Sequence, residues 1–241
     1  KDASETVLLD DNFATLVNSV EEGRTIYDNI RKFLKYTLTS NAGEIWVMVL
    51  APFAGMPLPL MPLQILWINL VTDGLPGLAM ALEPSERDTM KRPLRQPNEP
   101  IIDRLMLWHI GVVGIVMGLV SLGAGYWYWD SSRGDSYDPA WGTIVFTVLT
   151  LSQMGHALAI RSSRDSLFSI GLLSNKALLG AVTLTFALQL AVIYVPVLQQ
   201  VFRTTALSWQ DLAICILLST TVFWVGELEK AIRRATMHRA P

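Results

Sequence analysis

The sequence has 241 residues, of which 51% are hydrophobic and 17% are charged, and its formal net charge is −2. A mean hydropathy of +0.36, with the apolar residues grouped in long blocks, is not typical of a soluble domain, so we predict a membrane protein. The small net charge offers no basic surface for nucleic acid, and the single cysteine, Cys215, excludes a disulfide within this chain.

Residues 19–35, with the sequence SVEEGRTIYDNIRKFLK, combine helical spacing of apolar side chains with many charges. This pattern predicts a stalk helix that continues directly into a membrane span. At ~1.5 Å of rise per residue, such a stalk extends some 25 Å from the membrane. A stalk implies a domain to which it connects, and the residues before it are too few to form that domain.

Six segments are apolar enough to cross a bilayer core, which takes ~20 residues of helix. The first two are joined by a short turn, because Pro52, Pro57, Pro59 and Pro62 interrupt the helix between them. The third and fourth are separated by a polar loop that contains turn-forming residues. The predicted spans are residues 36–54, 62–82, 105–128, 143–160, 178–199 and 209–228.

The distribution of basic residues indicates how these spans are oriented. With the N-terminus in the cytoplasm, 17 of the 19 Lys and Arg residues fall on the cytoplasmic side, and only Arg133 and Arg203 do not. We therefore predict an all-α, multi-pass membrane protein with both termini cytoplasmic. It consists of a six-transmembrane-helix bundle at residues 36–229, a long cytoplasmic stalk helix, and a cytoplasmic tail at residues 230–241.

Two groups of polar residues lie at mid-depth in the first two spans. Asn41 and Glu44 are three residues apart on one face of the first span. Asn69, Thr72 and Asp73 share a face of the second span, where Gly74 and Pro76 follow and interrupt the helix. Since a short turn joins the two spans, the two groups are expected to be neighbours.

A carboxylate buried in hydrocarbon must be paired, protonated or bound to a cation. Neither span supplies Lys or Arg at this depth, so a cation from outside the chain is the natural partner. The oxygen ligands of Asn, Thr, Asp and Glu suit hard ions such as calcium, magnesium, sodium or potassium. Irregular backbone beside Asp73 is also typical of a binding site.

The alternative interpretation is that these polar groups only hold helices together by hydrogen bonds. That alternative stays open for Asn41 or Thr72 taken alone, and less so for Glu44 and Asp73 together. Gln153 on the fourth span is a tentative further ligand, with an interhelical hydrogen bond as its alternative. His156, one turn later, is interpreted as a histidine of the core.

Two stretches resemble a known family. The first is DDNFATLVNSVEEGRTIYDNIRKFLKYTLTSNAGE, and the second is LQILWINLVTDGLPGLAMALEPSERDTMKRP. Both are similar to the C-terminal third of P-type cation-transporting ATPases, in particular the calcium-pump branch. The resemblance is strong over residues 1–103 and weaker over the last four spans, which agree in length and order.

The resemblance implies that the six spans are the fifth to tenth of a ten-span pump. Residues 1–18 would then be the tail of the cytoplasmic phosphorylation domain, and 19–35 the stalk of the fifth span. In the calcium pumps of this family the fifth and sixth spans hold the transported ions. The ligands that match are Asn41, Glu44, Asn69, Thr72 and Asp73.

The resemblance does not by itself decide which ion is transported. Pumps that bind two calcium ions carry a Glu on the eighth span, where this chain has Gln153. The neutral side chain favours one calcium per cycle or another stoichiometry, and KYTLTSN leans toward sodium/potassium-type pumps. Gly43 and Gly74 fit the calcium-like pattern. We expect calcium export, with a sodium- or other cation-specific pump as the alternative.

The phosphorylated Asp of the family and its nucleotide-binding motifs do not occur in this sequence. We expect the chain to be inactive in ATP hydrolysis by itself, because ATP and Mg²⁺ would bind to domains that lie outside it. Its expected partners are the lipid bilayer, which we expect to be the plasma membrane (the inner membrane of a cell), and the remainder of the pump. That remainder comprises spans one to four and the actuator, nucleotide and phosphorylation domains.

Two other classes of protein fit the sequence less well than a pump. A passive channel requires a continuous polar stripe, whereas the sequence has one polar layer. A non-catalytic membrane fragment, ion-binding subunit or structural bundle does not need a stalk together with two buried carboxylates.

Overall fold

The computed structural model describes residues 12–86, 88–93, 99–129, 139–162 and 165–237, and all secondary structure within them is helical. Three predicted regions lie wholly or partly outside these residues. They are residues 1–11 of the predicted segment 1–18, residues 130–138 of the predicted polar loop at 130–141, and the last four residues of the predicted tail.

Four helices in the described part of the chain are long and apolar enough to cross a membrane. Their bounds are Arg104–Tyr128, Ala140–Ala159, Lys176–Tyr194 and Trp209–Thr236. These helices, together with a long first helix, confirm the predicted fold class, an all-α membrane protein. The first two predicted spans take different forms from these four and are described next.

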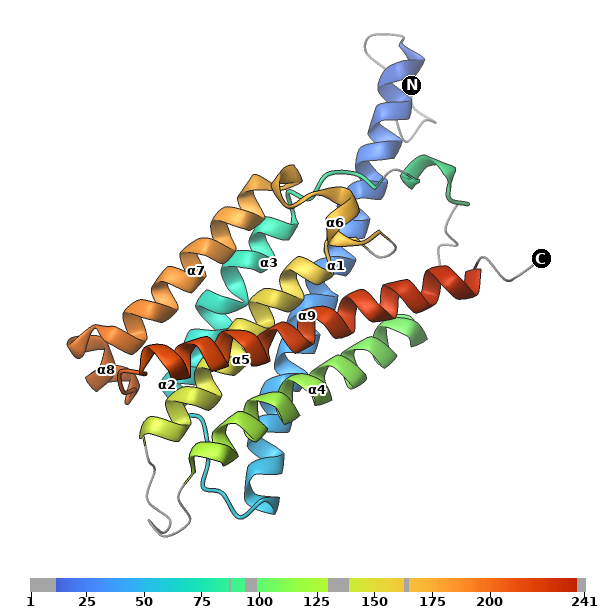
Figure 1. The fold of residues 1–241 in the computed structure, drawn as a ribbon. Helices are drawn as coiled ribbons and strands as arrows, with labels where there is room; N and C mark the ends of the chain where they lie inside the picture. Colours follow the sequence, from blue (N-terminus) through green and yellow to red (C-terminus); the bar gives the residue numbers. More distant parts are fainter. Residues whose placement is uncertain (1–11, 87, 94–98, 130–138, 163–164, 238–241) are drawn as a thin grey trace.

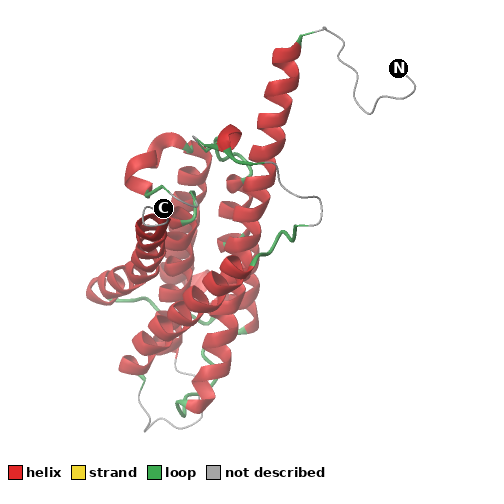
Figure 2. Ribbon diagram, turned by 90° about the vertical axis from the view of Figure 1, so that its right-hand side faces the viewer, coloured by secondary structure: helices red, strands yellow, loops and turns green. Residues whose placement is uncertain are grey.

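The first helix, α1, runs without interruption from Phe13 to Phe53. It therefore contains both the predicted stalk and the predicted first span, and it begins six residues before the predicted start of the stalk. The Asn12 side chain caps it by accepting a hydrogen bond from the amide of Ala14 at 3.0 Å. The N-terminal part of α1 projects beyond the other helices (Figures 1 and 2).

The second predicted span is divided into three helical pieces. These are α2 (Pro62–Trp67), the π-helical turn η1 (Ile68–Thr72) and α3 (Gly74–Met80). A connection that contains the short 3₁₀ helix η2 (Thr89–Lys91) leads on to α4 (Arg104–Tyr128).

The centre of the bundle is α5 (Pro139–Ala159), which packs against α4 and against α9 (Trp209–Met237). Of the four apolar helices it is the most buried. The last helix continues nine residues past the predicted end of its span, so most of the predicted tail is helical.

The helices α1 and α4 approach each other closely through glycine. A Cβ atom built on Gly118 would lie 2.7 Å from the Cβ of Trp46, and one on Gly114 would lie 2.7 Å from the Cβ of Ala42. The spacing Gly-x-x-x-Gly is the small-residue pattern by which membrane helices pack backbone to backbone. The part of α1 that the sequence predicts as the first span is held against α4 by this contact.

The segment between α5 and the last helix consists of α6 (Leu167–Ile170), η4 (Leu172–Ser174), α7 (Lys176–Tyr194) and α8 (Pro196–Phe202). The prediction that the fifth span extends to residue 199 is wrong, because α7 ends at Tyr194. Pro196 forces Val195 into an extended conformation, with ψ of 118°, and starts the separate helix α8.

The connection after α3 runs along the stalk and is bound to it by polar contacts. Arg24 donates hydrogen bonds to the carbonyl oxygens of Thr89 at 2.8 Å and Arg92 at 3.0 Å. Lys32 forms an ion pair with Glu86 at 3.1 Å. This connection, the N-terminal end of α1 and the C-terminal end of α9 all lie at the same end of the bundle (Figure 1).

Candidate cation site

The predicted break in the second span is a turn of π-helix that ends next to Asp73. The amide of Asp73 bonds to the carbonyl of Ile68 at 2.8 Å, five residues back, in place of the usual four. Single π-helical turns within α-helices occur frequently at functional sites. The helix resumes at Gly74, so the irregular backbone lies just before the residues where the sequence predicted it.

Pro76 and Tyr36 explain how this break is stabilised. Pro76 has no amide hydrogen, so it cannot donate to the carbonyl of Thr72, four residues earlier. The hydroxyl of Tyr36 donates to that carbonyl instead, at 2.8 Å. A fully buried side chain of α1 therefore holds the backbone of the break in place.

The carboxylate of Glu44 lies at the meeting point of three helical elements. It is 6% exposed. Its Oε2 atom accepts a hydrogen bond from the side-chain amide of Asn69 at 3.1 Å, and its Oε1 atom accepts one from the side-chain amide of Gln153 at 3.3 Å. The structure thus brings together three of the predicted site residues, from α1, η1 and α5.

Thr72 and Asp73 occupy the adjacent turn and differ from Glu44 in their partners. Their side chains are 0% and 3% exposed. Neither carboxylate oxygen of Asp73 has a hydrogen-bond partner among the described residues, and the same holds for the hydroxyl of Thr72 and the amide oxygen of Gln153. The hydroxyls of Ser40 and Tyr36 lie near Asp73.

Buried oxygens without partners need an explanation, because nearly all buried polar groups in proteins are hydrogen-bonded. Binding a cation is one such explanation, and it fits the donor set. Oxygens of carboxylate, hydroxyl and amide groups are the ligands of hard cations. No Lys or Arg forms an ion pair with Glu44 or Asp73 among the residues that the structure describes.

Asn41, the remaining predicted ligand, lies with Asn69 on the more open side of this site. Asn69 is exposed although it bonds to Glu44, and Asn41 is only partly buried. Asn41 forms no hydrogen bond with the other predicted ligands in the described structure. The site is therefore closed by α5 on one side and open where Asn41 and Asn69 lie. Four of the six predicted ligands, Asn41, Asn69, Thr72 and Gln153, are neutral. Among the described residues, no group of three or more His, Cys, Asp or Glu is arranged so that it could hold a metal ion.

One buried cluster beside the site was not predicted from the sequence. The Nε2 atoms of His109 and His156 are 2.9 Å apart, and the Nδ1 atom of His109 bonds to Glu229. The ring of His156 stacks on Tyr36 with centroids 5.9 Å apart. His156 is thus a hydrogen-bonded histidine of the core, as interpreted from the sequence. The spacing of residues cannot reveal this pair, since it joins α4 to α5.

Comparison with known proteins places the chain among ion-transporting ATPases. The family model described as "Cation transporting ATPase, C-terminus" matches residues 57–232. A calcium-transporting ATPase of Bacillus subtilis (strain 168) is 43% identical over 217 residues, which are 90% of this chain and 24% of that protein.

Two eukaryotic relatives agree with this. The calcium-transporting ATPase type 2C member 1 of Mus musculus is 35% identical over 235 residues, 98% of this chain and 25% of that protein. Calcium-transporting ATPase 1 of Yarrowia lipolytica is 37% identical over 232 residues, 95% of this chain and 24% of that protein. The chain spans about a quarter of the length of these relatives.

Proposed function

This chain belongs to the family of cation-transporting ATPases, as the C-terminal region of such a protein, and we propose that it is the membrane transport domain of an ATP-driven calcium pump. The remainder of the pump would supply the first four spans and the actuator, nucleotide and phosphorylation domains. ATP and Mg²⁺ would bind there. We further propose that the protein lies in the plasma membrane. The distribution of Lys and Arg supports the placement of both ends of this chain in the cytoplasm.

One observation carries the choice of binding site. Glu44 is held by Asn69 and Gln153, and beside it Asp73 has two buried oxygens without hydrogen-bond partners. We propose that the transported ion binds between these two carboxylates. Thr72 and Asn41 would supply further oxygens, and Gln153 would contribute its free amide oxygen.

The fold suggests how this site is coupled to the cytoplasmic domains. α1 is a single helix of 41 residues, so a displacement of its stalk is transmitted to Glu44. Tyr36, on the same helix, bonds to the carbonyl of Thr72 and therefore links that displacement to the π-helical turn. Movement of α1 would change both halves of the oxygen cage and with them the affinity for the ion.

A sodium-transporting pump is the second candidate, and Gln153 is the observation that favours it. This side chain is fully buried beside Glu44 and is neutral, so the site holds two carboxylates. Fewer negative charges lower the preference for a divalent ion over a monovalent one. The calcium-transporting relatives support calcium as the first choice.

The test is ion-dependent phosphorylation of the intact protein by ATP, measured in titrations of calcium and of sodium. We expect calcium to be required for the wild type, and the Asp73→Asn variant to need at least about tenfold more calcium. The matched control is Asp211→Asn, which changes a carboxylate bound to Tyr128 and Ser208 at the start of α9. Phosphorylation that requires sodium and ignores calcium would contradict the choice of ion.

A further inference from the structure

A cavity of about 250 Å³ lies at the end of the bundle that carries the stalk, between α1, the start of α4 and α9. The described residues that line it include five cationic side chains and two carboxylates. The cations are Arg31, Lys32, Lys35, Arg92 and Arg233. Its volume is below the ~300–1,000 Å³ of pockets for drug-sized ligands, so it suits a compact polar group.

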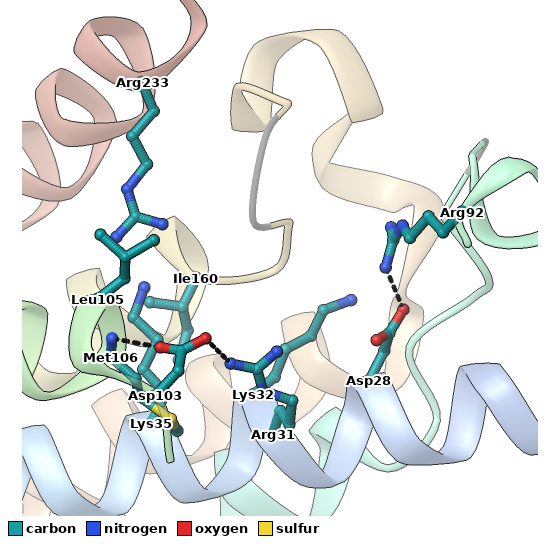
Figure 3. A pocket seen from close by; sticks show the side chains of 10 residues that line it. All are labelled: Asp28, Arg31, Lys32, Lys35, Arg92, Asp103, Leu105, Met106, Ile160 and Arg233. Carbon is teal, nitrogen blue, oxygen red and sulfur yellow. Dashed lines mark hydrogen bonds and ion pairs between the residues drawn. The ribbon is translucent and has the colours of Figure 1, made fainter. Parts of the chain in front are cut away.

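The cations of this cavity come from three separate parts of the chain. Arg31, Lys32 and Lys35 lie within five residues of one another on α1, Arg92 comes from the connection after α3, and Arg233 comes from α9. Figure 3 shows Arg233 extending from α9 toward Asp103 and Leu105, across the cavity from the cations of α1. Convergence from three elements makes the site a product of the tertiary fold.

Only two of the carboxylates that pair with these cations line the cavity itself, and Arg92 also pairs with Glu86 and Asp88 outside it. Asp103 pairs with Arg31 at 2.5 Å and Asp28 with Arg92 at 2.7 Å. Lys32 and Arg233 pair with Glu86 and Glu229, which do not line the cavity.

Lys35 is the exception among these cations. No hydrogen bond or ion pair reaches its ammonium group from any residue in the described part of the chain. The carboxylates of Glu229 and Asp103 act on it only from a distance. A partly buried cation without a direct ion pair favours the binding of an anion. Phosphate suits this place because its oxygens accept hydrogen bonds from several Lys and Arg donors together.

The surface next to the cavity is apolar. Leu105 lines the cavity and is also 59% exposed, and Trp108, one turn further along α4, is 68% exposed. Residues three apart lie on one face of a helix, so both side chains face outward at the start of this span. An exposed indole at the end of a span is typical of the membrane interface.

From this combination we propose that the cavity binds the phosphate of an anionic phospholipid headgroup, in the leaflet where α4 begins. The headgroup phosphate would contact Lys35 and Arg233, and the acyl chains would lie against Leu105 and Trp108. Basic pockets between membrane helices bind anionic headgroups in this way. The apolar wall is the observation that favours a lipid over free phosphate. The proposal does not depend on which ion the protein transports.

The proposal is tested on the intact protein by native mass spectrometry with added phosphatidylglycerol, or with phosphatidylcholine of the same acyl chains. We expect Lys35→Gln and Arg233→Gln each to weaken binding of phosphatidylglycerol about fivefold, since each cation near a membrane surface contributes ~1 kcal/mol to binding an anionic lipid. Binding of phosphatidylcholine is expected to be the same in all variants.

Two further variants separate the cavity from general charge and from folding. Lys176→Gln removes an exposed charge at the start of α7 and should bind phosphatidylglycerol like the wild type. Lys35→Arg keeps the charge and should retain binding. Equal binding of phosphatidylglycerol by the wild type and both cavity variants would overturn the proposal. The proposal would also be overturned if the protein bound inorganic phosphate through Lys35 but bound phosphatidylglycerol no more tightly than phosphatidylcholine.

Discussion

At the scale of single residues, the two carboxylates of the candidate site differ in what surrounds them. Glu44 accepts hydrogen bonds from two amides, whereas Asp73 accepts none in the described structure. A buried carboxylate with amide donors is partly compensated, and one without them depends on a cation or a proton. We therefore expect loss of the bound ion to destabilise the buried carboxylate of Asp73 more than that of Glu44.

Tyr36 is expected to stabilise the break in the second span. In Tyr36→Phe the carbonyl of Thr72 loses its donor, while Pro76 cannot replace it. Leaving a buried acceptor unsatisfied costs ~1–3 kcal/mol, so we expect the free energy of unfolding to fall by about that amount. Denaturant unfolding of the purified protein measures this.

The control for Tyr36 is Tyr126→Phe. The side chain of Tyr126 is 55% exposed, and its hydroxyl forms no hydrogen bond within the described residues. We expect this variant to stay within about 0.5 kcal/mol of the wild type. A similar loss in both variants would show that the hydroxyl of Tyr36 has no special role.

Asp103 gives a prediction for the dependence of stability on pH. Burial raises the pKa of this carboxyl, but the hydrogen bonds from the amide of Met106 and from Arg31 outweigh it, and the pKa lies below its usual value. Because the pKa is lower in the folded state, the charge stabilises the fold above the unfolded-state pKa of ~3.9. This contribution is lost as the pH falls through the folded-state pKa.

The comparison with Asp103→Asn isolates that charge, because Asn is an equally good N-cap for α4. We expect the thermal midpoint of the wild type to exceed that of the variant by a constant amount between about pH 5 and 7. The difference should shrink below about pH 4. A difference that stays constant down to pH 3 would contradict this assignment.

The proximity of the polar residues in the first two predicted spans was predictable from the sequence, but their individual contacts were only partly so. Helical spacing placed Asn69, Thr72 and Asp73 on one face, and the short turn made Glu44 their neighbour. The hydrogen bond from Gln153 to Glu44 depends on how α5 packs. No local pattern contains that information, and the contact between His109 and His156 was missed for the same reason.

At the scale of elements, the π-helical turn η1 shapes the second predicted span, and the glycines of α4 bring that helix into close contact with α1. Gly118→Ala tests the contact between α1 and α4, since its Cβ would lie 2.7 Å from the Cβ of Trp46. Overpacking typically costs ~1–3 kcal/mol, and we expect the free energy of unfolding to fall by that amount.

Gly111→Ala is the matched control on the same helix. A Cβ at Gly111 meets no atom within 4 Å, so the alanine should leave stability unchanged or raise it by up to about 1 kcal/mol. The same measurement of unfolding serves for both variants. If Gly118→Ala were as stable as Gly111→Ala, the close approach of the two helices would not exist in solution.

The ends of elements were harder to predict than the elements themselves. Hydropathy continues past Tyr194, but Pro196 ends α7 there. Hydropathy decreases after residue 228, but α9 continues to Met237 through a charged segment. In the second span the sequence indicated a break at Gly74–Pro76, whereas the irregular turn precedes it, because the proline acts on the carbonyl four residues back.

At the scale of the whole molecule, a buried ion pair connects three helices at the end that carries the stalk. Arg161, at the end of α5, bonds to Glu83 after α3 at 2.9 Å. Asn175, at the start of α7, bonds to the same carboxylate at 2.7 Å. The relative positions of α3, α5 and α7 are fixed by this cluster.

Removing one partner of this pair should destabilise the protein strongly. Arg161→Met leaves Glu83 buried and unpaired, which typically costs ~3–5 kcal/mol. The double variant Arg161→Met with Glu83→Met removes both charges and should recover most of the lost stability. Thermal unfolding of the wild type and both variants measures this, and a double variant no more stable than the single one would contradict it.

The general architecture of the chain follows from its hydropathy and charge. Four spans, the long first helix and the membrane class were predictable, because the bilayer imposes a helix length and an apolar composition. The way in which the spans pack was not, since apolar side chains in adjacent helices fit in many arrangements. The glycines of α4 select one of these arrangements.

The central claim is that a cation binds between Glu44 and Asp73, and equilibrium binding of radioactive calcium to the intact protein without ATP tests it most directly. We predict that Glu44→Gln and Asp73→Asn each weaken binding by more than about tenfold, while Asp211→Asn binds like the wild type. Calcium bound as tightly by both site variants as by the wild type would contradict the account.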